Sequence, residues 1–283
     1  KMYENKKAFY RINPVSRRYR RCSDQLLQHL SNSDTLQKEI AENHFLVYFQ
    51  PKISSESRMI VGCEALIRYT PQPGVLITPG EFLPLLEEFH TVSLIDFYVF
   101  RFVCSRLKSW QDQGRQIFPV SVNFSLHTLR EAELSRRLLD ICNQYGIPAN
   151  YLEIEITEKV RNEETIDIKQ LIAELQSTGF TVTLDDFGTE CANVALMSEV
   201  SFDALNLDKR MVDHITTNSR NRAIVESISE VCLKLGIRMV AEGIENEEQY
   251  AVLRACGIDL FQGYLFSRPI PVEEFERDYL GKP

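Results

Sequence analysis

The chain has 283 residues, a formal net charge of −8, 44% hydrophobic residues and 25% charged residues. This balance is typical of a folded globular protein and argues against a disordered one. The acidic charge argues against a surface for duplex nucleic acid, which would be basic. No run of about 18 apolar residues occurs, so we expect no membrane span in this fragment.

The seven cysteines are scattered and form no C-x-x-C pair. Such a set is typical of reduced thiols and argues against a zinc site. We therefore expect a cytoplasmic protein, either free or as the cytoplasmic part of a larger, membrane-tethered one.

Residues 1–45 differ from the remainder of the chain. A basic cluster precedes apolar residues at roughly helical spacing; the cluster is Arg17, Arg18, Arg20 and Arg21, and the apolar residues are Leu26, Leu27, Leu30, Leu36, Ile40 and Phe45. This spacing predicts N-terminal connecting helices. Residues 46–283 then form the main domain.

Two strands open the main domain, at residues 46–53 and 59–67, with a short polar turn between them. A connection this short cannot hold a crossover helix, so these strands should be antiparallel. A long helical region follows at 79–107. Six further strands are expected at 118–124, 151–156, 180–185, 202–207, 237–241 and 259–262, with helices between them. Eight strands alternating with helices predict an α/β fold, a closed (β/α)8 barrel with one antiparallel strand.

Acidic or amide side chains stand at the ends of nearly all these strands. They are Glu64, Asn123, Glu155, Asp185, Asp186, Asn206, Asp208, Glu242 and Gln262. In such barrels the strand ends meet at one mouth, where function resides. Carboxylates gathered there would repel each other without cations, and all-oxygen ligands suit Mg²⁺ or Mn²⁺. The pattern favours metal-assisted phosphoester chemistry, for which the adjacent pair Asp185-Asp186 could serve two ions.

Ordered motifs between about residues 46 and 271 resemble the EAL family of cyclic-di-GMP phosphodiesterases. They are Gln50-Pro51, Glu64-Ala65-Leu66-Ile67-Arg68, Val122-Asn123, Glu155-Ile156-Thr157-Glu158, Asp185-Asp186-Phe187-Gly188-Thr189, Ala241-Glu242-Gly243-Ile244-Glu245, and Gln262-Gly263-Tyr264 with Pro269. The resemblance implies a modified TIM barrel, cyclic di-GMP as ligand, and Mg²⁺ or Mn²⁺ as cofactor. It also implies hydrolysis of one phosphodiester bond to the linear dinucleotide.

The resemblance assigns roles by motif position. Metal ligands would be Glu64, Asn123, Glu155, Asp185 and Asp186, and Glu242 would position or activate the water. Arg68 would hold a phosphate with its planar fork of donors. Gln50, Leu66, Asp208, Glu245 and Gln262 would lie near the substrate, and Glu158 would support the loop that follows Asp185-Asp186.

One catalytic residue of the family is replaced. The sixth strand of the family ends in K-I-D, whereas this chain has Asn206-Leu207-Asp208. The family's lysine holds the attacking water and offsets negative charge, so its loss should cost about two to three decades in rate; the alternative is a harmless substitution. The loop after Asp185-Asp186 also departs from G-T-G-Y-S-S, with Glu190 in place of a glycine.

Two other lysines could stand in, and neither is expected to. Lys209 has the wrong strand parity to share the face of Asn206. Lys52 lies at the turn end of the antiparallel strand, so it should point toward the opposite mouth.

Three functions stay open. The favoured one is a domain that binds cyclic di-GMP with impaired or absent hydrolysis; the others are an active metal-dependent phosphodiesterase and an interaction domain without ligand. Residues 1–7 resemble the end of a GGDEF domain, which would make the parent protein a GGDEF–EAL tandem. An upstream GGDEF or sensor domain and a homodimer are expected partners.

Overall fold

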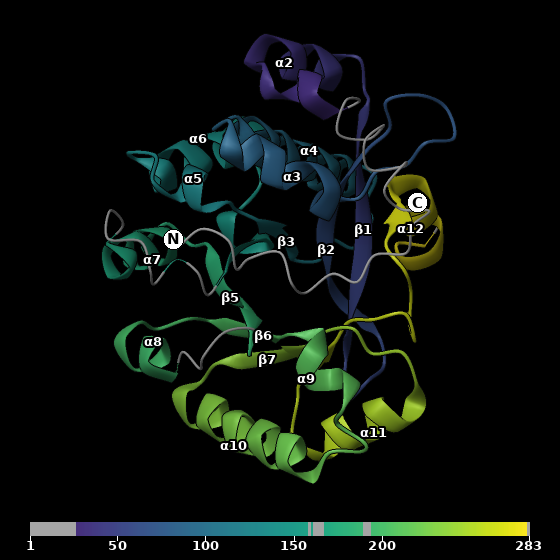
Figure 1. The fold of residues 1–283 in the computed structure, drawn as a ribbon, viewed down its shortest axis with the longest axis vertical. Coiled ribbons are helices and arrows are strands. Elements are labelled where there is room, and N and C mark those ends of the chain that lie inside the picture. The colour runs from purple at the N-terminus through teal and green to yellow at the C-terminus, as the bar shows by residue number, and fades with distance from the viewer. Residues whose placement is uncertain (1–26, 158–159, 161–166, 189–193, 282–283) are drawn as a thin grey trace, which may run out of the picture.

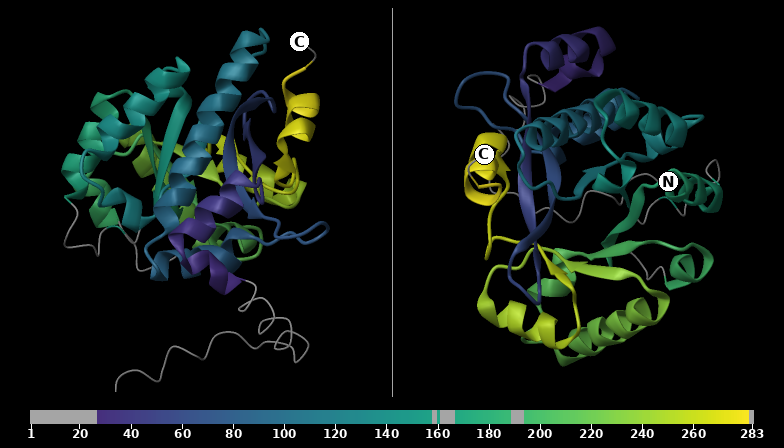
Figure 2. Two further views of the ribbon diagram at one scale, coloured as in Figure 1. Left: turned by 90° about the horizontal axis from the view of Figure 1, so that it is seen from above. Right: turned by 180° about the vertical axis from the view of Figure 1, so that it is seen from behind.

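The computed structural model describes residues 27–157, 160, 167–188 and 194–281. Eight strands close into a barrel that helices surround, and a short ninth strand extends the sheet (Figures 1 and 2). The predicted (β/α)8 barrel is confirmed. Glu158, Glu190 and residues 1–26 lie outside the described residues, and so do the expectations that fall on them.

The barrel strands follow each other around the ring in chain order, and β1 closes it by pairing with both β2 and β8. Their bounds are β1 (Phe45–Ser54), β2 (Ile60–Tyr69), β3 (Val120–Asn123), β4 (Leu152–Thr157), β5 (Thr181–Phe187), β6 (Ala204–Leu207), β7 (Arg238–Ala241) and β8 (Leu260–Phe261), with β9 (Ile270–Pro271) beside β1.

Strand β1 runs against its neighbours, as the short turn at 54–57 predicts. Its register sets Gln50 opposite Glu64 and Lys52 opposite Gly62. The strands β2 to β8 are parallel to one another. Their carboxyl ends therefore open at one mouth, and the N-terminal end of β1 lies at that same mouth.

The helices lie in two groups around the barrel (Figure 1). On one side are α3 (Pro79–Glu88), α4 (Val92–Asp112), α5 (Leu126–Leu129) and α6 (Leu134–Tyr145), and on the other α8 (Val194–Glu199), α9 (Lys209–Asp213), α10 (Ser219–Leu235) and α11 (Glu247–Ala255). Helix α7 (Ile168–Ser177) follows β4, α12 (Val272–Tyr279) lies beside β1, α2 (Ser33–Ala41) precedes the barrel, and short 3-10 turns are η1 (His29–Ser31) and η2 (Ala149–Tyr151).

Two helical expectations need correction. The region 79–107 is two helices, because the chain turns at His90, which takes a left-handed φ of 57°. Phe45 is the first residue of β1 rather than the end of a helix, because Asn43, at φ 61°, ends the preceding helical segment. Asparagine tolerates this conformation better than most residues.

Polar side chains define where several helices begin. Asp208, Asn218 and Asn246 each accept a backbone N–H in the first turn of α9, α10 and α11, respectively. Such a cap is worth about 1 kcal/mol. The caps of α9 and α11 follow β6 and β7 closely in the chain, so these two helices begin near the strand ends at the mouth.

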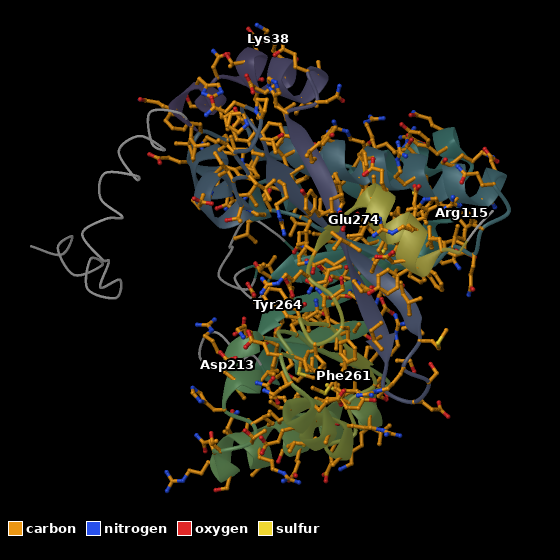
Figure 3. All side chains as sticks on the ribbon, turned by 90° about the vertical axis from the view of Figure 1, so that its right-hand side faces the viewer. Lys38, Arg115, Asp213, Phe261, Tyr264 and Glu274 are labelled. Atoms are coloured by element: carbon orange, nitrogen blue, oxygen red, sulfur yellow. The ribbon has the colours of Figure 1, made fainter. Side chains whose placement is uncertain are left out.

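The hydrophobic core lies between the barrel and its helices. Helix α4 contributes a continuous buried face that includes Ile95, Phe100, Val103 and Leu107. Burying such a side chain is worth about 1.5–3 kcal/mol. Figure 3 shows the side chains of Lys38 and Arg115 toward the periphery, whereas Phe261 is fully buried.

Within the described residues, none of the helices has the length and apolar character needed to cross a membrane.

Candidate functional site

The strand ends converge on a cleft of about 580 Å³ at the C-terminal mouth of the barrel. Of the predicted site residues, nine line this cleft: Gln50, Glu64, Leu66, Asn123, Asp185, Asp186, Glu242, Glu245 and Gln262. Glu155 and Asn206 lie beneath it, buried and bonded to each other. Eleven of the predicted residues therefore lie at this cleft or directly beneath it.

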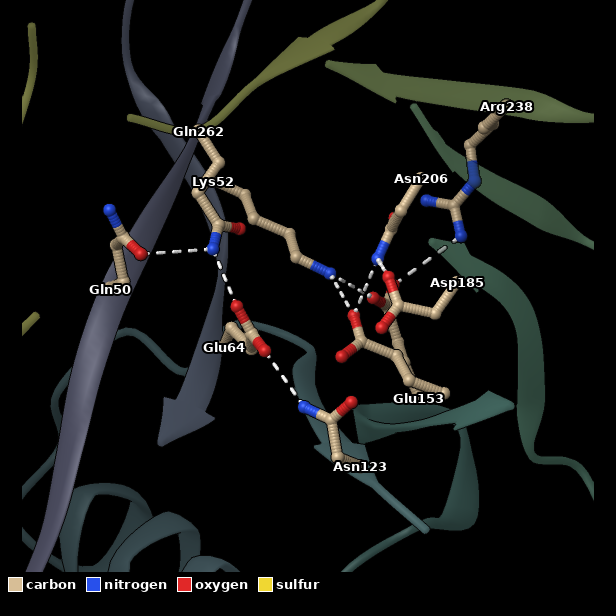
Figure 4. Close-up of polar contacts among 10 residues, drawn as sticks. Gln50, Lys52, Glu64, Asn123, Glu153, Asp185, Asn206, Arg238 and Gln262 are labelled. Atoms are coloured by element: carbon tan, nitrogen blue, oxygen red, sulfur yellow. Dashed lines mark hydrogen bonds and ion pairs between the residues drawn. The ribbon is translucent and has the colours of Figure 1, made fainter. Parts of the chain in front are cut away.

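Glu64 is the centre of one hydrogen-bonded branch (Figure 4). Asn123 Nδ2 donates to Glu64 Oε1 at 2.8 Å, and Gln262 Nε2 donates to Glu64 Oε2 at 2.5 Å. Gln262 Nε2 also donates to Gln50 Oε1 at 3.1 Å. This branch ties β1, β2, β3 and the end of β8 together.

Glu155 is the centre of the second branch. Asn206 Nδ2 donates to Glu155 Oε1 at 3.0 Å and to Asp185 Oδ1 at 2.9 Å. Lys52 Nζ donates to the same Glu155 Oε1 at 3.0 Å and to Glu153 Oε2 at 3.2 Å. Thus two donors share one oxygen of Glu155.

The expectation for Lys52 was wrong. Its Cα lies low on β1, but its side chain runs through the barrel interior and brings Nζ to the underside of the site (Figure 4). Only 2% of Lys52 is exposed. Its alternation with Gln50 along β1 puts both residues on the inner face, and this was the signal that could have revealed it.

Lys209 opens α9 rather than continuing β6, so the strand parity used in the prediction does not apply to it. Its Nζ contacts Glu245 Oε1 at 2.6 Å and Asp213 Oδ1 at 2.9 Å. This lysine lines the cleft but is paired with carboxylates on the rim, so it does not take the place of a lysine at position 206.

Two predicted substrate residues lie outside the lining. Arg68 is half-buried, donates to the carbonyl of Ile67 at 2.8 Å and sits over the ring of Tyr48. Asp208 caps α9 and pairs with Arg210 at 2.8 Å. Their contact with a ligand stays a prediction.

Mutual repulsion among the carboxylates is strong. Burial, followed by repulsion from Glu155, raises the pKa of Glu64 to about 7. Burial raises the pKa of Asp185 and Glu242 well above the usual range, and nearby carboxylates add to the effect. Burial would lower the pKa of Lys52, but attraction to Glu155, Glu153 and Glu64 outweighs it and raises that pKa. A cation at the mouth would relieve this repulsion.

Unused acceptor atoms show that the site fits such a cation. Glu155 Oε2, Asn206 Oδ1 and Gln262 Oε1 are buried and have no hydrogen-bond partner among the described residues. A buried acceptor without a partner is costly. Oxygen atoms from carboxylates and amides are the ligands that Mg²⁺ and Mn²⁺ prefer.

The backbone at Asp186 shapes the pair of adjacent aspartates. The pairing of β5 with β6 shifts register between Leu184 and Phe187, and Asp186 has a left-handed φ of 59°. This irregularity allows both Asp185 and Asp186 to line the cleft, where strict alternation would direct them to opposite faces.

A second acidic group lies beside the last residue of β2 and does not line the cleft. Glu39, Glu42 and His44 gather at the end of α2. His44 Nδ1 already contacts Glu39 at 2.7 Å, and Tyr69 donates to the same carboxylate at 2.9 Å. This group is a paired surface cluster and is not the predicted site.

Fold and site together define a (β/α)8 barrel with one reversed strand and a carboxylate-rich mouth suited to a divalent cation. The chain belongs to the EAL domain family, whose sequence profile matches residues 33–269.

Named relatives and a solved structure agree with this assignment. The chain is 31% identical over 255 residues to cyclic di-GMP phosphodiesterase NbdA of Pseudomonas aeruginosa, covering 89% of this chain and 33% of that protein. It is 28% identical over 240 residues to the bifunctional diguanylate cyclase/cyclic di-GMP phosphodiesterase MucR of the same species, covering 84% and 35%. The c-di-GMP complex of the PaMucR phosphodiesterase superposes with a TM-score of 0.80 at 27% identity, covering 88% of this chain and all of that one.

The chain spans about a third of the length of these curated relatives. It is an EAL domain of the kind found in cyclic di-GMP signalling proteins.

Proposed function

We propose that this domain binds cyclic di-GMP in the cleft with Mg²⁺ or Mn²⁺, and that its hydrolysis of the ligand is impaired or absent. Glu64, Asn123, Glu155, Asp185 and Asp186 would hold the metal. The cation supplies Lewis acidity toward a phosphate oxygen and the nucleophilic water. The rate of hydrolysis then depends on how the chain's own side chains orient the ligand and the water.

The observation that carries the proposal is that both amide hydrogens of Asn206 are already donated to carboxylates. Its amide has two hydrogens, and they point to Glu155 Oε1 and Asp185 Oδ1. No hydrogen is left to donate to an attacking water, and the buried Oδ1 can only accept. A lysine at this position would bring three donors and a positive charge. The asparagine has neither a free donor nor a charge, so it would hold the carboxylates in place without activating the water.

Ligand binding is supported by the rest of the cleft. Gln50, Glu245 and Gln262 line it together with the exposed ring of Tyr264. Amides and carboxylates can pair with the donors and acceptors of guanine edges, and an aromatic ring can stack on a base. Half-buried Arg68 carries the charge suited to a phosphate. Glu242 would hold the water against the phosphate.

The whole protein is proposed to be larger than this domain. One relative combines diguanylate cyclase and phosphodiesterase activities, and this chain covers 35% of it. We therefore propose a GGDEF or sensor domain upstream. We also propose a cytoplasmic location for this part of the protein and a homodimer as its assembly.

The test measures binding and conversion in one sample. The purified domain is incubated with cyclic di-GMP and excess Mn²⁺; bound ligand is measured by equilibrium dialysis and the linear dinucleotide by chromatography. We expect saturable binding without matching product. Cyclic di-AMP, which has the same phosphodiester ring but different bases, serves as the control ligand.

The two alternatives give different results. Rapid formation of the linear dinucleotide would contradict the proposal and show an active phosphodiesterase. No binding of cyclic di-GMP, with or without Mn²⁺, would instead indicate an interaction domain.

A further inference from the structure

A buried ion cluster lies directly beneath the mouth of the barrel. Lys52 from β1 contacts Glu153 and Glu155, which lie two residues apart on the same face of β4. Figure 4 shows the side chain of Lys52 beside Glu153. Arg238 Nη2, at the start of β7, lies 3.5 Å from Glu153 Oε1. The family motifs quoted above include Glu155 but neither of the two cations.

Glu155 is held asymmetrically. Its Oε1 accepts from both Lys52 Nζ and Asn206 Nδ2, each at 3.0 Å. Its Oε2 is buried and has no hydrogen-bond partner in the described part of the chain. The carboxylate therefore presents one occupied oxygen and one unused oxygen.

We propose that Lys52 is a positioning residue that anchors Glu155 through Oε1, so that Oε2 alone is offered to a divalent cation. This inference rests on the proposed function, because it assumes the metal site at the mouth. Lys52 reaches no substrate; it acts through Glu155. Outer contacts of this kind orient ligands in many metal sites.

Two opposing effects decide the sign of a Lys52 substitution. The ammonium repels a divalent cation, which favours tighter binding without it. Against this, Lys52 lies between Glu155 and Glu153 of β4 and also attracts Glu64 of the neighbouring strand β2. Without Lys52, the amide of Asn206 is the one remaining donor to Glu155 among the described residues. The nearby carboxylates of Glu153, Glu64 and Asp185 repel Glu155, so it loses its fixed orientation. We expect the loss of the direct contact at 3.0 Å to outweigh the relief of this repulsion.

The experiment measures Mn²⁺ affinity by calorimetry and by electron paramagnetic resonance of the free ion, without nucleotide. Lys52→Met removes the anchor and nearly matches its length. We expect about 10- to 100-fold weaker Mn²⁺ binding, the usual cost of losing an outer-shell partner. Glu153→Gln is the matched control, because it removes the other partner of Lys52 and leaves the contact with Glu155; it should bind Mn²⁺ nearly as wild type does.

A purely structural role would give a different pattern. It would lower the melting temperature of both variants and leave Mn²⁺ affinity unchanged in both. If Lys52→Met does not fold, the double variant Lys52→Met/Glu153→Met replaces the buried pair by apolar side chains, which proteins often tolerate. The double variant should show the same weakened binding.

Three results would overturn the inference. Unchanged or tighter Mn²⁺ binding by the folded Lys52 variant would overturn the role of Lys52 and leave the proposed metal site intact. Equal weakening by Glu153→Gln would show that the ion cluster acts as a unit rather than through Glu155. A wild-type protein that binds no Mn²⁺ would overturn both the proposed metal site and the role of Lys52.

Discussion

Two buried carboxylates near the barrel mouth are held in opposite ways. Asp96 on α4 accepts three hydrogen bonds at Oδ2, from the backbone N–H of Ser125 at 3.0 Å, from Ser125 Oγ at 2.7 Å and from Thr128 Oγ1 at 2.6 Å. Glu155 has two donors on one oxygen, whereas its other oxygen is buried without a partner among the described residues.

This contrast separates a structural acid from the proposed metal ligand. The donors of Asp96 come from the first turn of α5, so its carboxylate fixes the segment that directly follows Asn123. Glu155 instead lies among Glu64, Asp185 and Asn206, and its Oε2 accepts no hydrogen bond from the described residues. Both carboxylates are buried, so the proposal of a metal ligand rests on the unused oxygen of Glu155 and not on its burial.

The largest effect should come from Glu155→Gln. The substitution replaces the unused carboxylate oxygen by a neutral amide, so we expect Mn²⁺ affinity to fall at least about 100-fold, at or beyond the upper end for outer-shell changes. Calorimetric titration with Mn²⁺ measures it. A variant that binds Mn²⁺ as tightly as wild type would remove Glu155 from the site.

The pH dependence of stability sharpens the same contrast. The raised pKa of Glu64, about 7 against 4.5, means that the folded state holds a proton that the unfolded state has lost. The contribution of Glu64 to the free energy of unfolding of the metal-free protein is therefore present at low pH and is lost as pH rises. The loss from this group alone is about 2 kcal/mol between pH 5 and pH 8. Urea denaturation in EDTA measures it, and Mn²⁺ should suppress the loss.

Addition of Mn²⁺ and the Glu64→Gln variant isolate the contribution of Glu64. Asp96 also makes the protein less stable as pH rises, because burial raises its pKa to about 6, but Mn²⁺ should not change the contribution of Asp96. Glu64→Gln should remove the Glu64 part. Stability that rises with pH in EDTA would contradict the account.

The smallest effect is expected from Thr128→Val. This nearly isosteric change removes one of the donors to Asp96 and should cost about 1–2 kcal/mol of unfolding free energy. Mn²⁺ affinity should stay unchanged, because the other donors still hold the turn. Denaturation and titration of the same preparation test both parts; weaker Mn²⁺ binding would show that Asp96 belongs to the site after all.

The sequence predicted the barrel and the convergence of its strand ends because both depend on short-range patterns. Strand alternation and the polar turn at 54–57 set β1 against β2 and placed Glu64, Glu155 and Asp185 at one mouth. The break between α3 and α4 gave no such signal, since Phe89-His90-Thr91 contains neither glycine nor proline.

The role of Lys52 was missed for a different reason. The position of its Cα toward the end of the barrel opposite the mouth was predicted correctly. A lysine side chain is long enough, however, to span more than one layer of the barrel interior. Asp96 was missed because its donors, Ser125 and Thr128, come from another element. Both residues depend on tertiary contacts that periodicity does not encode.

The most direct measurement compares the rates at which wild type, Asn206→Lys and Asn206→Met convert cyclic di-GMP to the linear dinucleotide with saturating Mn²⁺. Lysine would add the donor and charge that Asn206 lacks, so its rate should exceed that of wild type by at least about 100-fold. Methionine matches the length of lysine without its charge and should give no gain. Equal rates for wild type and Asn206→Lys would contradict the central claim that Asn206 limits hydrolysis in this domain.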